Sequence, residues 1–478
     1  MKKTTLFLAL FLTTALSAQN IVTTTLLGTK TQSQLLSQFG FPFIQYGVKY
    51  YRITYTTTNT QNALDTVSGL LVVPNNPNKI FPRLVYQHGT SGSKLDVPSY
   101  TVNNGEGQLG LLLGGMGYVA LMPDYLGLGV SDGFHPYVHA ASEASVAVDM
   151  LRAEKEFEAQ NPVFTNDQLF ITGYSQGGHA AMALHRSIEQ ELSAEFTVTA
   201  AAPLSGPYSI SGVMRDLILT DAVYYYPAYI PNTALSYQTV YGNIFDEMTD
   251  LFKPEYAALI TPFYNGTKTL SVLNSQLISA LTANEGACRP FKMLQDSVVA
   301  GVENNPNHPI NLALKANDTY NNWTPQAPMR LFYCKADDQV PFMNSIVARD
   351  SLLAAGAMDF QAADVDSTAD HGDCYEPAMS NTLLFFLGFQ QIGTVSIDDP
   401  TEQNRLHISP NPAHDVLVLK NLPAAGQLEI IDYQGKIHIS TSLRAGDASV
   451  PVQHLPSGVY LAKFRTGKVV RTERVVIN

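Results

Sequence analysis

The sequence LFITGYSQGG, residues 169–178, gives the clearest indication of the fold class. Its first half is apolar and β-branched, which predicts a short buried strand that ends near Gly173. Ser175 then stands between Gly173 and Gly177, and a helix is expected to follow. A strand that turns sharply into a helix needs small residues two positions either side of the turn, and both glycines meet that need. The start of the helix also favours negative charge that develops beside Ser175.

A serine at such a turn is a candidate nucleophile, and it needs a base to remove its proton. Among the eleven histidines, we expect His371 to be that base, because it follows the last expected strand of the sheet. His179, on the helix after the serine, is expected to be a packing or surface residue. The base needs an acid to orient it. We expect Asp337, which follows an apolar strand, and Asp338 stays open as the alternative acid.

Two backbone donors are expected to stabilise an oxyanion next to the serine. One is the N–H of Gln176, the residue that follows the candidate nucleophile. The other is expected in the loop HGTSG, residues 88–92, where we favour the N–H of Thr90. A pair of such donors, one after the serine and one from an early loop, is typical of α/β hydrolases, as is the order Ser, Asp, His along the chain.

The arrangement of apolar segments predicts the fold class. A β-rich run covers about residues 47–74, and strands then alternate with helices from about residue 83 to 391. This alternation indicates a mostly parallel sheet flanked by helices on both faces. Together with the turn at Ser175 and the order Ser, Asp, His, it leads us to expect an α/β-hydrolase fold. The rhythm is lost between about residues 207 and 328, a tyrosine-rich stretch that we interpret as an inserted helical cap. Extra core helices are the alternative interpretation.

The pattern changes again near the C-terminus. Residues 393–404 have the composition of a linker, and beyond them apolar residues alternate with a period of two, as in VLVLK at 416–420. Residues 405–478 are therefore expected to form a small all-β sandwich. This part carries nine Lys or Arg and five Asp or Glu, whereas the whole chain has a net charge of −12. The change in sign supports two separate units.

The first residues predict export. Lys2 and Lys3 precede an apolar run at residues 6–12, and a small-residue site ends at Ala18, so residues 1–18 have the layout of a signal peptide. The catalytic domain is then expected over residues 19–392. A membrane anchor is the alternative, but the apolar run is shorter than the roughly 20 residues that span a bilayer. We expect no transmembrane segment in the mature chain.

Composition excludes several partners and cofactors. The acidic net charge of −12 argues against nucleic acid, which needs a basic face. The sequence shows no Cys-x-x-Cys pattern, so we expect no metal site and no cofactor. There are three cysteines, so at least one thiol stays unpaired in a monomer, and the pairing of the others is open.

Residues 45–390 resemble the secretory lipase group of α/β hydrolases, which includes fungal lipase A-type enzymes and bacterial relatives. The segments that carry the resemblance are YQHGT at 86–90, PDYLGLG at 123–129, HPY at 135–137 and GYSQGG at 173–178. The resemblance implies a triad of Ser175, Asp337 and His371 and a helical cap inserted before the acid. It also implies esterase or lipase activity on a small ester or lipid substrate.

The tail resembles the C-terminal sorting domain of type IX secretion substrates in Bacteroidetes. The matching segments are ISPNPA at 408–413, LPSGVY at 455–460 and RVVIN at 474–478. This resemblance implies the type IX secretion machinery as a partner. It also implies passage through the periplasm and the outer membrane, with release or attachment at the cell surface. A carbohydrate-binding sandwich is the alternative, but the tail has no row of aromatic residues for stacking on a sugar.

Two other functions stay open on the sequence alone. A serine peptidase, of the aminopeptidase or dipeptidyl-peptidase kind, could use the same fold and the same residues. No acidic or basic cluster near Ser175 indicates a subsite for a peptide terminus. A surface binding protein that kept the fold is the third hypothesis, and the intact set of Ser, Asp and His argues against it.

Overall fold

The computed structural model describes residues 20–395, 406–467 and 469–478 of the chain. The expected signal peptide, residues 1–18, lies outside the described residues, as does most of the expected linker at residues 393–404. No helix of the described residues is long and apolar enough to cross a membrane.

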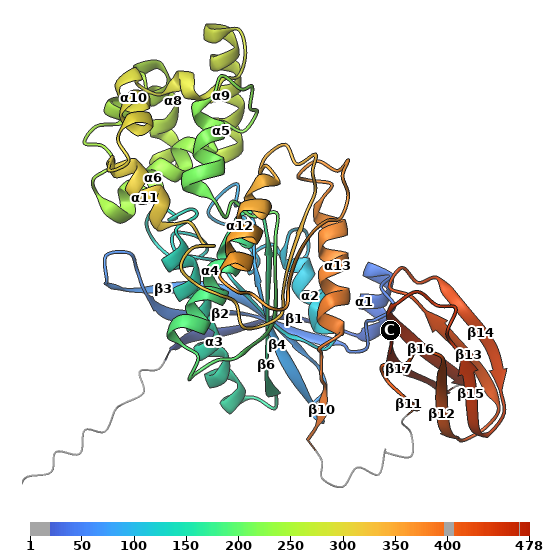
Figure 1. Ribbon diagram of the computed structural model, residues 1–478. Coiled ribbons are helices and arrows are strands. Elements are labelled where there is room, and N and C mark those ends of the chain that lie inside the picture. The colour runs from blue at the N-terminus through green and yellow to red at the C-terminus, as the bar shows by residue number, and fades with distance from the viewer. Residues whose placement is uncertain (1–19, 396–405, 468) are drawn as a thin grey trace, which may run out of the picture.

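A large mixed sheet forms the centre of the molecule (Figure 1). Its strand order is β1-β2-β3-β5-β4-β6-β7-β8-β9, and β10 pairs with β4. The strands from β5 to β9 run parallel, while β1, β2 and β3 are antiparallel to their neighbours. The strands are β1 (Ile21–Lys30), β2 (Val48–Thr58), β3 (Leu64–Pro74), β4 (Lys79–Gln87), β5 (Val119–Pro123), β6 (Phe164–Tyr174), β7 (Val198–Leu204), β8 (Met329–Tyr333), β9 (Phe360–Asp364) and β10 (Gly393–Thr394).

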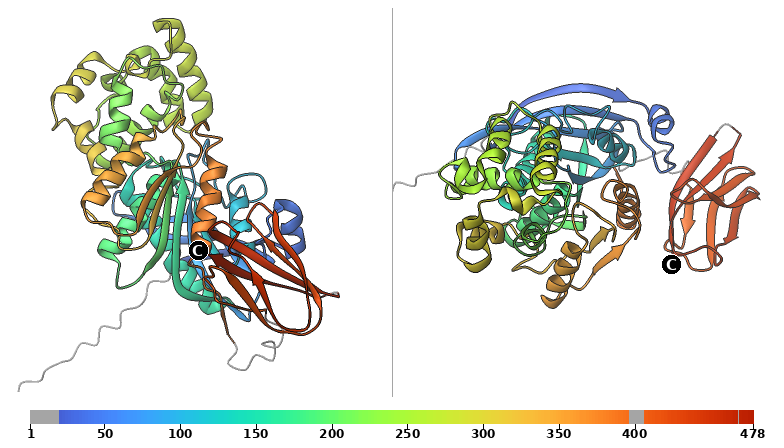
Figure 2. Two further views of the ribbon diagram at one scale, coloured as in Figure 1. Left: turned by 45° about the vertical axis from the view of Figure 1, so that its right-hand side comes forward. Right: turned by 90° about the horizontal axis from the view of Figure 1, so that it is seen from above.

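Helices cover both faces of this sheet, as the right-hand view of Figure 2 shows from above. On one face, apolar residues of α3 (Ala140–Gln160), α4 (Gln176–Glu191) and α12 (Met343–Ala354) pack into one buried cluster with the strands. On the other face, α1 (Gln32–Phe39), α2 (Gly107–Gly115) and α13 (Tyr375–Leu387) contribute to a second cluster. The predicted fold class, a sheet flanked by helices, is confirmed.

The chain between β7 and β8 forms a helical lobe above one end of the sheet (Figure 1). The lobe has its own apolar core, to which residues of several of its helices contribute. Its elements are a π-helical turn (Ile210–Met214), α5 (Arg215–Leu219), α6 (Tyr229–Tyr241), α7 (Met248–Leu251), α8 (Pro254–Tyr264), α9 (Leu270–Glu285), a 3-10 turn (Pro290–Met293), α10 (Asp296–Asn304) and α11 (Pro309–Ala316). We refer to this lobe as the cap.

The C-terminal part consists of two small antiparallel sheets that share one apolar core. Leu417 and Leu419 are fully buried in that core, as the period-two alternation predicts. Arg474 donates hydrogen bonds to the carbonyl oxygens of Leu387 and Gln390, so this part contacts the end of α13. The strands are β11 (His407–Ser409), β12 (Val416–Leu422) and β15 (Gly446–Pro451) in one sheet, and β13 (Gly426–Ile431), β14 (Ile437–Leu443), β16 (Gly458–Thr466) and β17 (Val469–Ile477) in the other.

Candidate active site

Ser175 lies at a strained turn between β6 and α4. Its backbone has φ 61° and ψ −121°, a conformation that residues other than glycine rarely adopt and that the surrounding structure must hold. Gly173 and Gly177 lie against the carbonyl oxygen of Gln87, and a Cβ atom on either glycine would collide with it. The turn therefore has the geometry of a nucleophile elbow, with the serine hydroxyl lifted clear of the backbone.

The structure brings Ser175, His371 and Asp337 into one hydrogen-bonded chain. Nε2 of His371 lies 2.8 Å from Oγ of Ser175, and Nδ1 of the same ring lies 2.7 Å from Oδ2 of Asp337. Because a carboxylate only accepts, the ring carries its proton on Nδ1 and leaves Nε2 to accept from the serine. The hydroxyl of Tyr174 donates to the carbonyl of His371 at 2.5 Å, which ties the histidine loop to the elbow.

The two candidate acids have different partners. The second carboxylate oxygen of Asp337 accepts from the backbone N–H groups of Gln339 and Val340, at 3.0 and 2.8 Å. Asp338 does not bond to the imidazole of His371. It accepts instead from the backbone N–H of His371 at 3.2 Å and from the hydroxyl of Tyr226 at 2.9 Å. The geometry therefore favours Asp337 as the partner of the ring. Asp338 instead connects its own loop to the loop of His371 and to the cap.

A disulfide between Cys334 and Cys374 connects the loop of the acid to the loop of the histidine. Cys334 directly follows β8, and Cys374 lies three residues after His371 and caps the start of α13. Both sulfurs are buried, and the third cysteine, Cys288, is a buried free thiol in the cap. The pairing that the sequence left open is thus the one that tethers the two loops.

The two expected oxyanion donors lie at the start of α4 and in the loop after β4. Gln176 is the first residue of α4, so its N–H has no acceptor within the helix. The loop that holds Thr90 follows β4 and is held by Glu106, which accepts from the N–H of Gly89 at 3.1 Å and from the hydroxyl of Tyr86 at 2.8 Å. The assignment of the Gln176 and Thr90 N–H groups as oxyanion donors stays a prediction.

The segment around Asp124 and Tyr125 supports the loop of Thr90 from behind. Asp124 is fully buried and accepts hydrogen bonds from the Ser68 hydroxyl and from both the N–H and the hydroxyl of Ser99. Burial raises the pKa of Asp124, and these hydrogen bonds oppose that effect. The hydroxyl of Tyr125 donates to the carbonyl of His88 at 3.1 Å. The sequence resemblance marked this segment, but nothing in the sequence indicated these contacts.

Tyrosines of the cap also contact the acid loop. Tyr224 donates to the carbonyl of Gln339 at 3.0 Å, and Tyr229 donates to its side-chain oxygen at 2.8 Å. Tyr226 bonds to Asp338, as described above. Three of the tyrosines that characterise the cap sequence therefore connect the cap to the loop that carries Asp337, through their hydroxyl groups.

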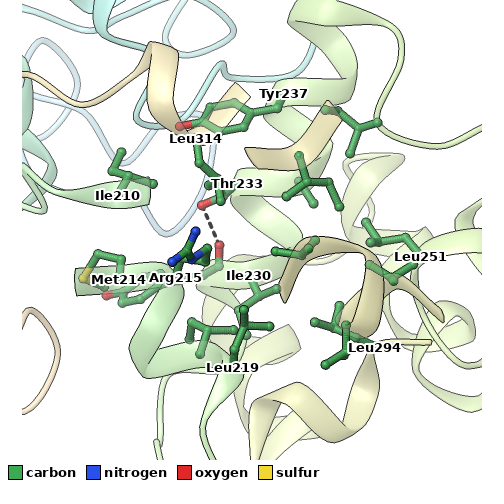
Figure 3. Close-up of a pocket in the computed structure, with 18 of the residues that line it drawn as sticks. Ile210, Met214, Arg215, Leu219, Ile230, Thr233, Tyr237, Leu251, Leu294 and Leu314 are labelled. Carbon is green, nitrogen blue, oxygen red and sulfur yellow. Dashed lines mark hydrogen bonds between the residues drawn. The ribbon is translucent and has the colours of Figure 1, made fainter. Parts of the chain in front are cut away.

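A small cavity of about 50 Å³ reaches Ser175, and a larger one lies next to it inside the cap. The two cavities share Ile210, Met214, Tyr229 and Thr233 in their linings. The larger cavity, shown in Figure 3, has a volume of about 140 Å³ and a lining that is almost entirely aliphatic or aromatic. The side of the serine that faces the cap is thus lined for an apolar group.

Within the residues that the structure describes, no group of three or more His, Cys, Asp or Glu side chains is arranged to hold a metal ion.

Comparison with known proteins gives a family for the tail and a fold for the rest. Residues 407–478 match the family of secretion system C-terminal sorting domains. The rice cell wall degrading esterase LipA from Xanthomonas oryzae is 27% identical, and the alignment covers 78% of this chain and 97% of that one, with a TM-score of 0.66. Candida antarctica lipase A is 14% identical over 77% of this chain and 81% of that one, with a TM-score of 0.57.

The comparison with curated protein sequences found no match. The fold likeness extends over most of the chain, whereas the family match is confined to residues 407–478, the two small sheets at its end. The chain therefore combines an α/β-hydrolase fold, like that of lipases and esterases, with a C-terminal secretion sorting domain.

Proposed function

We propose that this protein is a secreted serine hydrolase that cleaves carboxylic esters through an acyl-enzyme on Ser175. The observation that carries the proposal is the hydrogen-bonded chain of Ser175, His371 and Asp337 at 2.8 and 2.7 Å. The likeness to the LipA esterase supports an ester as the substrate class.

The geometry accounts for each step of such a reaction. Oγ of Ser175 attacks the ester carbonyl while Nε2 of His371 takes its proton, and Asp337 stabilises the imidazolium that forms. The N–H groups of Gln176 and Thr90 hold the oxyanion of the tetrahedral intermediate. His371 then returns the proton to the leaving alkoxide, and the alcohol departs. Water, activated by His371, hydrolyses the acyl-enzyme by the same steps.

The cavities support a location for the acyl side of the substrate. The small cavity at Ser175 adjoins the apolar cavity of the cap, whose lining offers few polar partners. An acyl group of apolar character therefore fits the cap cavity, and the acyl chain gains its binding energy by leaving water. We propose esters with an aliphatic acyl chain as substrates of this site.

The sorting domain supports a role in export. We propose that residues 407–478 direct the protein to the type IX secretion machinery, which carries it across the outer membrane to the surface or the medium. Fusion of residues 406–478 to a reporter with a signal peptide tests this step. The reporter should leave cells that have the machinery and stay in the periplasm of cells that lack it.

The central test compares Ser175→Ala with Ser145→Ala, a serine on α3 away from the elbow. Ser175→Ala should lower kcat for p-nitrophenyl butyrate by a factor of about 10⁴ or more and abolish labelling by a fluorophosphonate. Its thermal unfolding temperature should not change. Ser145→Ala should keep both. Turnover that survives in Ser175→Ala contradicts the proposal. Hydrolysis of dipeptidyl amides in preference to matched esters indicates a peptidase instead.

A further inference from the structure

A buried carboxylate and imidazole lie directly behind the elbow. Oε2 of Glu143, on α3, lies 2.7 Å from Nδ1 of His179, on α4, and their side chains are 1% and 0% exposed. Removing two charged groups from water is costly, and this cost often exceeds the attraction between them. The pair is not part of the chain formed by Ser175, His371 and Asp337, so the proposed chemistry leaves it without a role.

The hydrogen bonds of His179 indicate how the pair is protonated. Its Nε2 lies 2.8 Å from the carbonyl oxygen of Asn317, while Nδ1 faces the carboxylate of Glu143. A carbonyl oxygen only accepts, so Nε2 carries a proton, and one further proton lies in the bond between Nδ1 and Oε2 of Glu143. Whichever of these two atoms carries that proton, the other carboxyl oxygen, Oε1, is free to accept a further bond.

That further bond comes from the side chain of Gln176. Its Nε2 donates to Oε1 of Glu143 at 2.9 Å and lies 2.8 Å from Nε2 of His135. Nδ1 of His135 faces the carbonyl oxygen of Leu126 at 2.9 Å, so it carries the proton, and Nε2 is the acceptor. Burial lowers the pKa of His135 to about 4, which keeps the ring neutral near pH 7. Both amide protons of Gln176 are therefore held by fixed acceptors.

We propose that Glu143 is a positioning residue for the oxyanion donor, because its carboxylate, held by His179, clamps the side chain of Gln176 and so fixes the direction of the Gln176 N–H. The clamp matters here because Gln176 follows Ser175, whose strained backbone must be held by its surroundings. A donor that points a little away from the developing oxyanion loses most of its effect. This inference rests on the proposed function and adds to it a residue that touches neither the serine nor the substrate.

His179 and His135, which lie on the two sides of this arrangement around Gln176, are both hydrogen-bonded to residues of the cap or its end. Asn317 follows α11, where the cap returns to the sheet, and its side chain accepts from the N–H of Ala140 and donates to the hydroxyl of Tyr241. On the other side, the carbonyl of His135 accepts from the hydroxyl of Ser236, on α6 of the cap. The seating of the cap therefore helps to hold Glu143 and His135 in place around Gln176.

The first experiment measures kcat and KM for a p-nitrophenyl ester and the inhibition constants of two ketones. An alkyl trifluoromethyl ketone forms a hemiketal with Ser175 whose oxyanion lies in the proposed hole, whereas the matching methyl ketone binds without this adduct. For Glu143→Ala, kcat and the affinity for the trifluoromethyl ketone should both fall by about 30-fold, less than the roughly 100- to 1,000-fold typical for removal of one oxyanion donor, because the N–H group itself is retained. KM and the affinity for the methyl ketone should change less than about threefold.

Two variants serve as controls. Glu143→Gln keeps an oxygen for Gln176 and can donate to a neutral His179, so it should recover most of the loss. Glu154→Ala removes another buried, ion-paired glutamate of α3, whose partner is Arg83. It should lower thermal stability but leave the ratio of the two ketone affinities unchanged, because Glu154 does not contact the elbow.

A second variant keeps the proposal falsifiable if Glu143→Ala does not fold. Gln176→Met removes the clamped amide but keeps the backbone N–H, and it should show the same selective loss. The double variant with Glu143→Ala should lose no more than either single one, since both act through one contact. The role of Glu143 is overturned if the losses of the two single variants add up in the double variant, or if the affinities for the two ketones fall equally. Ester turnover by the wild-type protein would still support the proposed function in that case. A wild-type protein without ester turnover overturns both.

Discussion

The hydroxyl oxygen of Ser175 lies 2.8 Å from Nε2 of His371, although 196 positions separate the two residues in the chain. Ser175 is held by the turn from β6 to α4, and His371 by the loop between β9 and α13. The carboxyl ends of parallel strands meet at one edge of a sheet, so the strand order brings these loops together. A substitution in either loop can therefore disturb the contact between Ser175 and His371.

The two neighbouring aspartates should differ sharply when each is changed to asparagine. Asp337→Asn removes the charge that stabilises the His371 imidazolium and disfavours the needed tautomer, so kcat should fall by about 10⁴-fold. Asp338→Asn keeps an oxygen for the His371 N–H and should cost about tenfold or less, as loss of one loop contact. Steady-state kinetics on one ester compares them. A larger loss in Asp338→Asn contradicts the assignment of the acid.

Loss of the disulfide should weaken both stability and activity. Changing Cys334 and Cys374 together to alanine should lower the free energy of unfolding by about 2–4 kcal/mol, because the unfolded chain is no longer cross-linked. Since the bond joins the loops of Asp337 and His371, kcat should fall as well. Denaturant unfolding with and without reductant measures the effect. Cys288→Ser is the matched control, and it should keep the sensitivity of the wild type to reductant.

A bulky residue at the junction of the two cavities should shorten the preferred acyl chain. Thr233 lines both cavities, so Thr233→Phe should close the passage from Ser175 into the cap. We expect kcat/KM for a p-nitrophenyl octanoate to fall by about tenfold or more, while kcat/KM for the acetate changes little. Thr282→Phe, on the exposed side of α9, should leave the chain-length profile unchanged. Equal losses for both esters argue against the cap cavity as the acyl site.

Stability should fall as the pH decreases from about 6.5 to 4. Burial lowers the pKa of His135 from 6.5 to about 4, so as the pH falls the unfolded chain binds a proton before the folded one does. The stability is complete above the unfolded pKa, declines through this window and levels off below the folded pKa. Burial also lowers the pKa of His139 to about 4, which acts in the same direction.

For His135 alone the decline should amount to about 3 kcal/mol, from the size of its pKa shift. Urea unfolding at intervals from pH 7.5 to 4 measures it. The variant His135→Gln keeps an oxygen for the amide of Gln176 and removes the titrating ring, so its stability should depend less steeply on pH. Parallel curves for the two proteins contradict this origin of the pH dependence.

Elements with a clear local pattern were predictable from the sequence. The apolar run that ends at the elbow is part of β6, and the apolar strand expected before Asp337 is β8. The strand β1 and the helices α1 and α2 were not predicted. β1 has mostly exposed residues, and α2 has the sequence GQLGLLLGG, in which glycines disfavour a helix and the apolar residues surround its axis. Packing of α2 against the sheet outweighs that low propensity.

The elbow and the residue types of its partners follow from the sequence, since a tight strand–turn–helix junction imposes local requirements that short motifs reveal. The carboxylate that faces His371, the pairing of the cysteines and the surroundings of Gln176 become clear only in the folded molecule. These choices depend on distances between segments far apart in the chain, and no local pattern encodes such distances. Glu143 and His179 are an example, because in the sequence each is an ordinary helix residue. They form a buried pair only because α3 and α4 pack against each other.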